Sequence, residues 1–423
     1  MDNHFPFFEY QDGELYAENI PVRELAKQYG TPFYIYAASS IRRQFTTFQE
    51  ALNKVCAKPP LIAYACKAND RLGILKLMNN LGAGVDVVSV GEMKRALAAN
   101  IPASKIIFSG VGKTERELEE AIEAGIRQIN IESEPELKNL AIAAEKLQKD
   151  ISVSIRFNPD VEAGTHDKIS TGRSEDKFGV TAERIIHLYK HAAETKYLNP
   201  HGISMHIGSQ VADPRYFIPA FERINDLVHQ LRAEGLSVTE LDLGGGLGIT
   251  YRDEPEADIE AYAKLIKEMI EPLGCQLSFE PGRYLVGNAG ILVTKVIYVK
   301  ETDVKTHVIC DAAMNDLIRP ALYEAYHTIH PVIQNGADIR TVDIVGPICE
   351  SGDTHAKDRP LPLPEEGDYL AIHSAGAYGA TMSSYYNARV PACEVLVDGS
   401  DHTLINRQES IEQQIAREKT LLS

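Results

Sequence analysis

The chain has 423 residues, of which 44% are hydrophobic and 24% charged, with 30 glycines and 21 prolines. This length and composition predict a folded protein of two or three domains, or one large α/β barrel with an attached module, and they exclude disorder and a collagen repeat. The 43 Lys and Arg against 60 Asp and Glu give a net charge of -17 with histidine neutral. A surface of that sign repels phosphate backbones and anionic lipid, so we expect neither a nucleic-acid nor a membrane partner.

The sequence carries no sign of export or membrane insertion. No apolar run approaches the roughly 18 to 20 residues that cross a bilayer, and the first residues, MDNHFPFFEYQDGE, lack a basic region followed by an apolar one. The six cysteines are scattered without a C-x-x-C pair, which argues against a disulfide framework or a structural zinc site. We therefore expect a cytoplasmic protein.

From about residue 60 to 285, short β-rich runs alternate with amphipathic helical stretches, a pattern typical of parallel strands joined by crossover helices. Eight strands are predicted: LIAYACK (61–67), VDVVS (85–89), KIIFSG (105–110), QINIES (128–133), SVSIRFN (152–158), GISMHIGSQ (202–210), ELDLGGG (240–246) and QLSFEPG (276–282). Thr114 and Glu117 form a capping-box pattern at a helix start, and Gly235 is placed to end another helix. Eight such units predict a (β/α)₈ barrel.

Two regions depart from this alternation. The polar segment 160–179, between the fifth and sixth strands, predicts a mobile loop. After residue 285, strand-like runs such as GILVTKVIYVK and DYLAIHSAG are broken by Pro-rich turns such as DRPLPLPEEGD, which indicates a β-rich sandwich or barrel domain. We place the barrel at 35–285 and the β-rich domain at 1–34 plus 286–423.

Polar side chains cluster at the predicted carboxyl ends of the strands, where barrels of this kind carry their active sites. These residues are Lys67, Asp86, His206, Ser209, the glycines of GGGLG (244–248), Glu280, Pro281, Gly282 and Arg283. Each one alone is more often structural: a lysine is usually solvated, and a buried histidine is usually a core residue. Their coincidence at one rim favours a catalytic site.

Lys67 follows the apolar run LIAYAC, so we expect its amine at a partly desolvated barrel mouth, where burial favours the neutral form. A neutral lysine amine attacks aldehydes, and pyridoxal phosphate is such an aldehyde. GGGLG offers unobstructed backbone amides for a phosphate, although a tight turn explains it equally well. Glu280 could keep a pyridine nitrogen protonated, or simply pair with Arg283 at the surface.

One motif is misleading. GVGKT (110–114) ends like a nucleotide-binding P-loop, but the glycine that this loop requires at position 107 is Ile107. No H-E-x-x-H motif or other metal cage is present in the sequence, so we predict no metal site.

Taken together, the motifs YACKAN, MHIGSQ, GGGLG, EPGR, MNDLIRPALY, GPICESGDTHAKDRPLP and GAYGATMSSYYNARVPACEVLVDG resemble the diaminopimelate decarboxylase family, over residues 5 to 415. That family consists of fold-III pyridoxal-phosphate decarboxylases with a barrel, a β domain and active sites shared within a homodimer. One departure is Tyr284, where family members often carry a small residue.

The resemblance implies a role for each matching residue. Lys67 would hold the cofactor, His206 would stack on its ring and Glu280 would pair with its nitrogen. The remaining cofactor contacts would come from Asp86, Ser209, Gly245, Gly246, Pro281, Gly282, Arg283 and Tyr378. Substrate would be bound by Arg283, Arg319, Tyr323, Tyr378 and Glu350, with Cys349 of the partner subunit donating the proton.

The activity implied by the resemblance is decarboxylation of meso-diaminopimelate to L-lysine. Three alternatives stay open: a related decarboxylase of carboxynorspermidine, arginine, ornithine or a glutamyl conjugate; a non-catalytic cofactor carrier; and a phosphotransferase acting through GVGKT. Substrate profiling, carbon dioxide release and nucleotide binding separate them.

Overall fold

The computed structural model describes residues 5–162, 164, 171–173 and 175–422, and these form two compact units. One unit consists of residues 44–249 and 255–285, and the other of residues 1–43, 250–254 and 286–423. The predicted loop at 160–179 falls partly outside the described residues, so its mobility stays a prediction. Among the described residues, no helix combines the length and apolar character needed to traverse a lipid bilayer.

The first unit contains a closed barrel of eight parallel strands, in the spatial order β10-β11-β12-β5-β6-β7-β8-β9. The strands are β5 (Leu61–Ala65), β6 (Gly84–Val87), β7 (Ile106–Phe108), β8 (Gln128–Ile131), β9 (Ile151–Phe157), β10 (Leu198–Met205), β11 (Glu240–Asp242) and β12 (Gln276–Phe279). All eight coincide with predicted strands, so the predicted barrel is confirmed.

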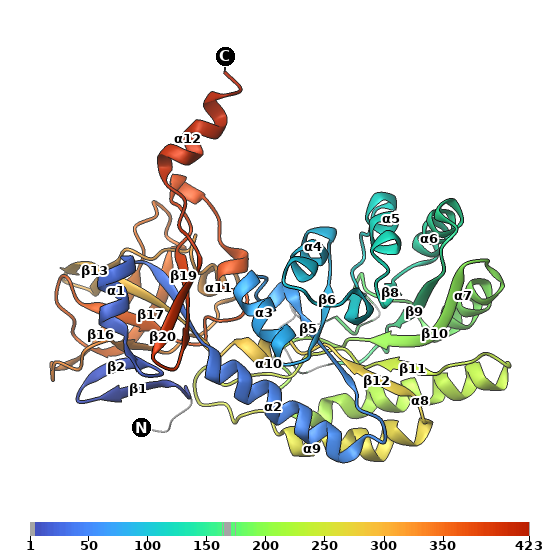
Figure 1. The fold of residues 1–423 in the computed structure, drawn as a ribbon. Helices are drawn as coiled ribbons and strands as arrows, with labels where there is room; N and C mark the ends of the chain where they lie inside the picture. Colours follow the sequence, from blue (N-terminus) through green and yellow to red (C-terminus); the bar gives the residue numbers. More distant parts are fainter. Residues whose placement is uncertain (1–4, 163, 165–170, 174, 423) are drawn as a thin grey trace. The chain divides into compact units, whose positions relative to one another are not determined.

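Helices surround the barrel strands (Figure 1). They are α2 (Ala38–Val55), α3 (Leu72–Asn80), α4 (Val90–Ala98), α5 (Glu115–Ala124), α6 (Glu134–Leu147), α7 (Ala182–Glu194), α8 (Ile218–Ala233) and α9 (Ile259–Leu265), with the short α10 (Arg283–Val286) after β12. The capping box predicted at α5 is present, because Thr114 and Glu117 each bond the other's backbone amide. After α8, Gly235 has the left-handed φ of +78° expected of a helix-ending glycine.

The second unit is β-rich, as predicted. A nine-stranded sheet has the path β17-β16-β14-β13-β4-β19-β20, with β18 pairing with β13 and β15 pairing with β18, and a small sheet joins β1, β2 and β3. The strands of the large sheet are β4 (Phe33–Ala37), β13 (Gly290–Glu301), β14 (Thr306–Cys310), β15 (Ile329–Pro331), β16 (Ile339–Val345), β17 (Thr354–Pro362), β18 (Tyr369–Ile372), β19 (Cys393–Asp398) and β20 (Asp401–Asn406). The small sheet contains β1 (Phe8–Gln11), β2 (Glu14–Ala17) and β3 (Ile20–Pro21), and the helices are α1 (Val22–Tyr29), α11 (Arg319–Tyr323) and α12 (Ile411–Lys419).

Two details differ from the sequence-based expectation. The Pro-rich stretch read as a turn begins inside β17, which carries Pro360 and Pro362. Proline lacks an amide proton and is confined mainly to edge strands, and β17 lies at one end of the sheet path. The predicted boundary at residue 35 also cuts through β4, which pairs with β13 and β19, so the β-rich unit extends to residue 43 and takes in 250–254.

Candidate active site

The carboxyl ends of β5 and β6 bring a lysine and a buried aspartate together. Lys67 lies in a short turn directly after β5, and its Nζ donates to Oδ2 of Asp86 on β6 at 2.8 Å. Asp86 is 0% exposed, and its other oxygen, Oδ1, is buried without a hydrogen-bond partner among the described atoms. The sequence suggested a neutral amine at this place, but an anionic partner stabilises the ammonium form. An orphaned buried carboxylate oxygen is costly unless a further donor reaches it.

A second buried carboxyl pair lies at the ends of β11 and β12. Asp242 closes β11 and Glu280 follows β12; the two carboxyl groups share a hydrogen bond and are 2% and 8% exposed. Burial, and then the charges of Asp242 and Asp86, raise the pKa of Glu280 well above its ordinary value, while Lys67 opposes the shift. Burial likewise raises the pKa of Asp242. Both shifts favour the protonated form of the carboxyl, more strongly at Glu280 than at Asp242.

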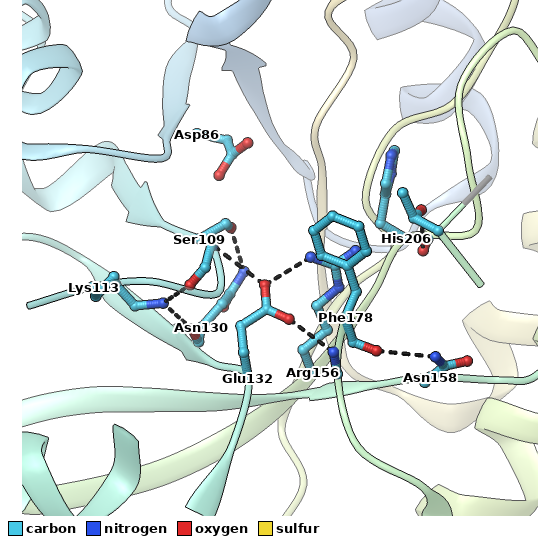
Figure 2. Close-up of polar contacts among 12 residues, drawn as sticks. Asp86, Ser109, Lys113, Asn130, Glu132, Arg156, Asn158, Phe178 and His206 are labelled. Carbon is cyan, nitrogen blue, oxygen red and sulfur yellow. Dashed lines mark hydrogen bonds and ion pairs between the residues drawn. The ribbon is translucent and has the colours of Figure 1, made fainter. Parts of the chain in front are cut away.

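Two neutral side chains, Ser109 and Asn130, hydrogen-bond this carboxyl pair, and Figure 2 shows these two side chains beside each other. Nδ2 of Asn130 donates to Oδ2 of Asp242 at 3.2 Å and to Oγ of Ser109 at 3.0 Å, and Oγ of Ser109 lies 3.4 Å from Oε1 of Glu280. None of these partners brings a positive charge. Among the described residues, Lys67 is the cationic side chain recorded at this cluster.

His206 follows β10 and has a defined tautomer. The amide of Gly245 donates to its Nδ1 at 3.2 Å, so in the neutral ring the proton sits on Nε2. Burial, then the positive charges of Arg156 and Lys67, hold the pKa of His206 well below its ordinary value. A protonated ring would also turn Nδ1 into a donor facing another donor. His206 is therefore a neutral imidazole.

The predicted glycine cradle requires glycine for steric reasons. A Cβ on Gly244 would lie 2.2 Å from the carbonyl oxygen of Met205, and one on Gly245 would lie 2.2 Å from that of Glu280. Gly246 has a φ of +121°, where side chains are rarely tolerated. The backbone here packs against the ends of β10 and β12. The amides of Gly244 and Gly245 donate to Oδ1 of Asp242 and Nδ1 of His206, so the amide of Gly246 is the candidate phosphate donor of this loop.

Beside this loop, two more predicted residues meet. Nε and Nη2 of Arg283 donate to Oγ of Ser209 at 3.2 and 3.0 Å, which joins the start of α10 to the segment after β10. Pro281 and Gly282 press against β5: the carbonyl of Pro281 accepts from the amide of Ala65, and a Cβ on Gly282 would lie 3.0 Å from the Cβ of Ala65.

The residues of this rim fit pyridoxal phosphate. A group with a protonated ring nitrogen would supply the positive charge that the Asp86, Asp242 and Glu280 carboxyls lack. The amide of Gly246 suits its phosphate, and Lys67 suits its aldehyde.

The other predicted site residues belong to the β-rich unit. Arg319 begins α11 and Tyr323 ends it; Nη1 of Arg319 lies 3.2 Å from Nε2 of His327, and its guanidinium lies 4.8 Å from the ring centroid of Tyr251. Tyr378 has a strained φ of +55°.

Cys349 and Glu350 lie on an exposed turn of the same unit. The amide of Cys349 donates to Oδ1 of Asn387, and the side chain of Glu350 hydrogen-bonds Tyr386. This turn is open to solvent in the single chain.

The structure also reveals rim residues that the sequence analysis missed. Ser109, Asn130, Glu132, Arg156 and Asp242 lie at or just after the carboxyl ends of barrel strands, and Glu92 lies in the first turn of α4, the helix that follows β6. Burial, aided by Asp86, raises the pKa of Glu92 to about 7, against the hydrogen bond that it accepts from Val88. Inspecting every polar residue at the strand ends would have found this set.

The structure explains two positions that the sequence singled out, Lys113 and Tyr284. Nζ of Lys113, the lysine of GVGKT, pairs with Glu136 at 2.6 Å and donates to the carbonyls of Gly110 and Asn130. Its recorded partners are therefore groups of the protein itself. Tyr284 is 6% exposed, and its ring lies 5.8 Å from that of Phe48.

Comparison with known proteins agrees with this geometry. The family model for the pyridoxal-dependent decarboxylase, pyridoxal binding domain, matches residues 38–287. The chain is 46% identical to diaminopimelate decarboxylase of Vibrio cholerae, covering 98% of this chain and 99% of that protein, and 49% identical to that of Neisseria meningitidis serogroup A, covering 96% and 100%.

A solved structure is similar along nearly the whole chain. Diaminopimelate decarboxylase from Helicobacter pylori, complexed with L-lysine, superposes with a TM-score of 0.90 at 38% identity and covers 94% of this chain and 99% of that one. The chain therefore belongs to the pyridoxal-dependent decarboxylases and, within them, to the diaminopimelate decarboxylase family.

Proposed function

We propose that the protein is a pyridoxal-phosphate-dependent carboxy-lyase that converts meso-2,6-diaminopimelate to L-lysine and carbon dioxide, the last step of lysine biosynthesis. The observation that carries this function is the cluster of buried carboxyl groups beside Lys67, where burial and like charges outweigh Lys67 and raise the pKa of Glu280. Relatives 46% and 49% identical carry this activity in their names, and the Helicobacter pylori structure holds L-lysine, the product.

Several residues of the barrel would hold the cofactor. Lys67 would bond to its aldehyde carbon, His206 would lie against its ring, and Glu280 with Asp86 would face the ring nitrogen. Its phosphate would take the amide of Gly246 and the hydroxyl of Ser209. Bound there, pyridoxal phosphate supplies an electron-poor ring that accepts the electron pair left by departing carbon dioxide.

The residues of the chain would direct this chemistry. Asp86 keeps the amine of Lys67 in place and can accept a hydrogen bond on its free oxygen. Glu280 can pass its proton to the ring nitrogen and remain as the carboxylate that stabilises it. The neutral ring of His206 adds no second positive charge that would compete for the carboxyl cluster.

The substrate carries two ammonium and two carboxylate groups, so it needs partners of both signs. Arg283 and Arg319 offer planar guanidinium groups for the carboxylate that survives, with Tyr323 and Tyr378 as hydroxyl donors. Glu350 would take the distal ammonium. An ornithine decarboxylase would need an acidic group there and no arginine.

We further propose a homodimer in which Cys349 and Glu350 come from the partner subunit, Cys349 delivering the proton that replaces the lost carboxyl group. Their exposed turn supports this arrangement. Mixing inactive Lys67→Ala and Cys349→Ala proteins should restore part of the activity through dimers with one intact site. No recovery after verified subunit exchange would exclude the shared site.

A cytoplasmic location is also part of the proposal, because all six cysteines are free thiols, as a reducing compartment keeps them, and three of the six are buried. Secretion of the folded protein by its source would contradict it.

The decisive experiment measures carbon dioxide release from meso-diaminopimelate with and without added pyridoxal phosphate. Release that depends on the cofactor and yields L-lysine is expected. Preference for carboxynorspermidine, arginine, ornithine or a glutamyl conjugate would indicate a related decarboxylase instead. Cofactor binding without release from any amino acid would indicate a carrier, and nucleotide binding would indicate a phosphotransferase.

A further inference from the structure

Glu132 is a buried carboxylate of the same rim, separate from the Asp86, Asp242 and Glu280 cluster. It follows β8 and is 4% exposed. Its Oε1 accepts from Nη1 of Arg156 at 2.7 Å and from the amide of Gly110 at 3.3 Å, and its Oε2 accepts from the amide of Gly179 at 2.8 Å (Figure 2). One carboxylate thus joins three segments: the turn after β7, strand β9, and the chain that returns at Gly179.

The returning chain packs along β9 and covers Arg156. The ring of Phe178 lies 4.7 Å from the guanidinium carbon of Arg156, and the carbonyl of Phe178 accepts from Nδ2 of Asn158 at 2.9 Å. The amide of Val180 donates to the carbonyl of Arg156, and a Cβ on Gly179 would lie 2.8 Å from that same oxygen. Arg156 is therefore held at its edge by Glu132 and on its face by Phe178.

The position of Arg156 bears on His206. Nδ1 of His206 accepts from the amide of Gly245, an arrangement that requires a neutral ring. A fixed guanidinium nearby disfavours the imidazolium form, and after burial Arg156 is the largest influence lowering the pKa of His206. A guanidinium free to swing away would not exert this effect consistently.

We propose that Glu132 is a positioning residue: by binding the Arg156 guanidinium and the Gly179 amide together, it fixes Arg156 beside His206 and holds residues 175–179 against β9. The catalytic part of this inference rests on the proposed function, while the structural part does not. A purely stabilising ion pair would make neither contribution to the site.

Glu132→Gln is the primary test. The carboxylate of Glu132 offers two acceptor oxygens to its donors, whereas a glutamine amide offers one, and its NH₂ group would face another donor. We expect kcat/KM of the holoenzyme to fall by about 10- to 100-fold, mainly through kcat, since misplacement by about 1 Å can cost that much. Glu132→Asp keeps the charge but is one methylene shorter, so its kcat/KM should lie between those of Glu132→Gln and the wild type. This variant replaces Glu132→Gln in the test if the amide variant does not fold.

The matched control is Glu240→Gln, the same substitution in another glutamate–arginine pair. Oε2 of Glu240 lies 2.6 Å from Nη2 of Arg127, at the opposite, amino-terminal end of the strands. This variant should keep kcat/KM within about twofold of the wild type. Wild-type rates in folded Glu132→Gln or Glu132→Asp would overturn the proposal.

A double-mutant comparison asks whether Glu132 acts through Arg156. If it does, Glu132→Gln combined with Arg156→Gln loses no more activity than Arg156→Gln alone. Glu240→Gln combined with Arg156→Gln should instead show the product of the two single effects. Multiplicative losses for the Glu132 pair would contradict the inference.

Limited trypsin digestion gives a readout that needs no turnover. Cleavage after the exposed Lys177 should become several-fold faster in Glu132→Gln and also in Asn158→Ala, and it should stay at the wild-type rate in Glu240→Gln. If wild-type protein releases no carbon dioxide but the digestion rates differ as expected, the proposed function fails, while the structural role of the Glu132–Gly179 hydrogen bond is retained. If turnover is normal and Glu132→Gln alters neither rate nor digestion, the inference fails alone.

Discussion

At the carboxyl ends of the barrel strands, Asp86, Asp242 and Glu280 lie buried beside one another, whereas at the amino ends Glu240 pairs with Arg127 and His201. Burial acts to raise the pKa of Glu240, but hydrogen bonds from His201 and Arg127 outweigh it and lower that pKa. At the other end, burial and like charges prevail, and the pKa of Glu280 rises.

The difference separates a structural from a functional use of charge. Paired charges at the amino ends favour the folded state on their own. At the carboxyl cluster, burial and like charges oppose the ionised carboxyls and Lys67 offsets them only in part, so the free energy of this end depends on what is bound there. Perturbed carboxyls of this kind concentrate at functional sites.

The largest effect at the carboxyl ends is expected for Lys67→Ala, which removes both the amine and the cation that pairs with Asp86. Carbon dioxide release should fall by about 10³-fold or more, because the covalent partner for the cofactor is gone. The bound-cofactor absorbance band should vanish with it. Lys54→Ala, which removes a solvent-exposed pair with Glu260, should change neither; a normal spectrum in Lys67→Ala would contradict the assignment.

Glu280→Gln tests the raised pKa of this carboxyl through the pH dependence of stability. The folded pKa of Glu280 lies above its ordinary 4.5, so its contribution to stability is fully present below pH 4.5 and is lost as pH rises through the raised pKa. Cofactor-free protein should therefore melt at progressively lower temperature as pH rises, and the amide should flatten that slope. Activity should drop about 10²-fold, because the ring nitrogen loses its carboxylate. A pH slope equal to the wild type's would count against the raised pKa.

Gly245→Ala should have a moderate effect at the same end. Its Cβ would meet the carbonyl oxygen of Glu280 at 2.2 Å, so the loop must shift, at a cost of about 1 to 3 kcal/mol of unfolding free energy. Cofactor affinity, measured by fluorescence titration, should weaken as well. Gly112→Ala is the control, since nothing lies within 4 Å of its Cβ. Equal stability and affinity in the two variants would refute the steric argument.

The smallest effect concerns His206. Its folded pKa lies below the ordinary 6.5, so its contribution to stability is present above pH 6.5 and is lost as pH falls toward the lowered pKa. Ring signals followed by NMR should show no titration between about pH 6 and 8. Arg156→Gln should move the midpoint upward, and a midpoint near 6.5 in the wild type would be inconsistent with a neutral ring.

Most of the fold could be predicted because each barrel strand is a short apolar run followed by an amphipathic helix. The prediction failed where a local signal has two meanings. Proline at 360 and 362 indicates a turn or an edge strand, and only the sheet order shows that β17 is an edge. The pairing of β4 with β13 and β19 joins residues far apart in the chain, which periodicity cannot reveal.

The site was partly predictable for a related reason. Lys67, Asp86 and His206 follow from the rule that barrels act at the carboxyl ends of their strands, and the family resemblance added a role for each. Arg156 and Glu132 escaped notice because their importance lies in a contact between β9 and the chain after β8. The raised pKa of Glu280 likewise depends on Asp242, 38 positions earlier, and local sequence does not show that the two carboxyls meet.

The central claim is that Lys67 carries the cofactor, and borohydride reduction of the holoprotein followed by peptide mapping tests it most directly. The account predicts a stable pyridoxyl group on the peptide containing Lys67 and on no other lysine. A pyridoxyl group on a different lysine, or none after reduction of fully loaded protein, would contradict it.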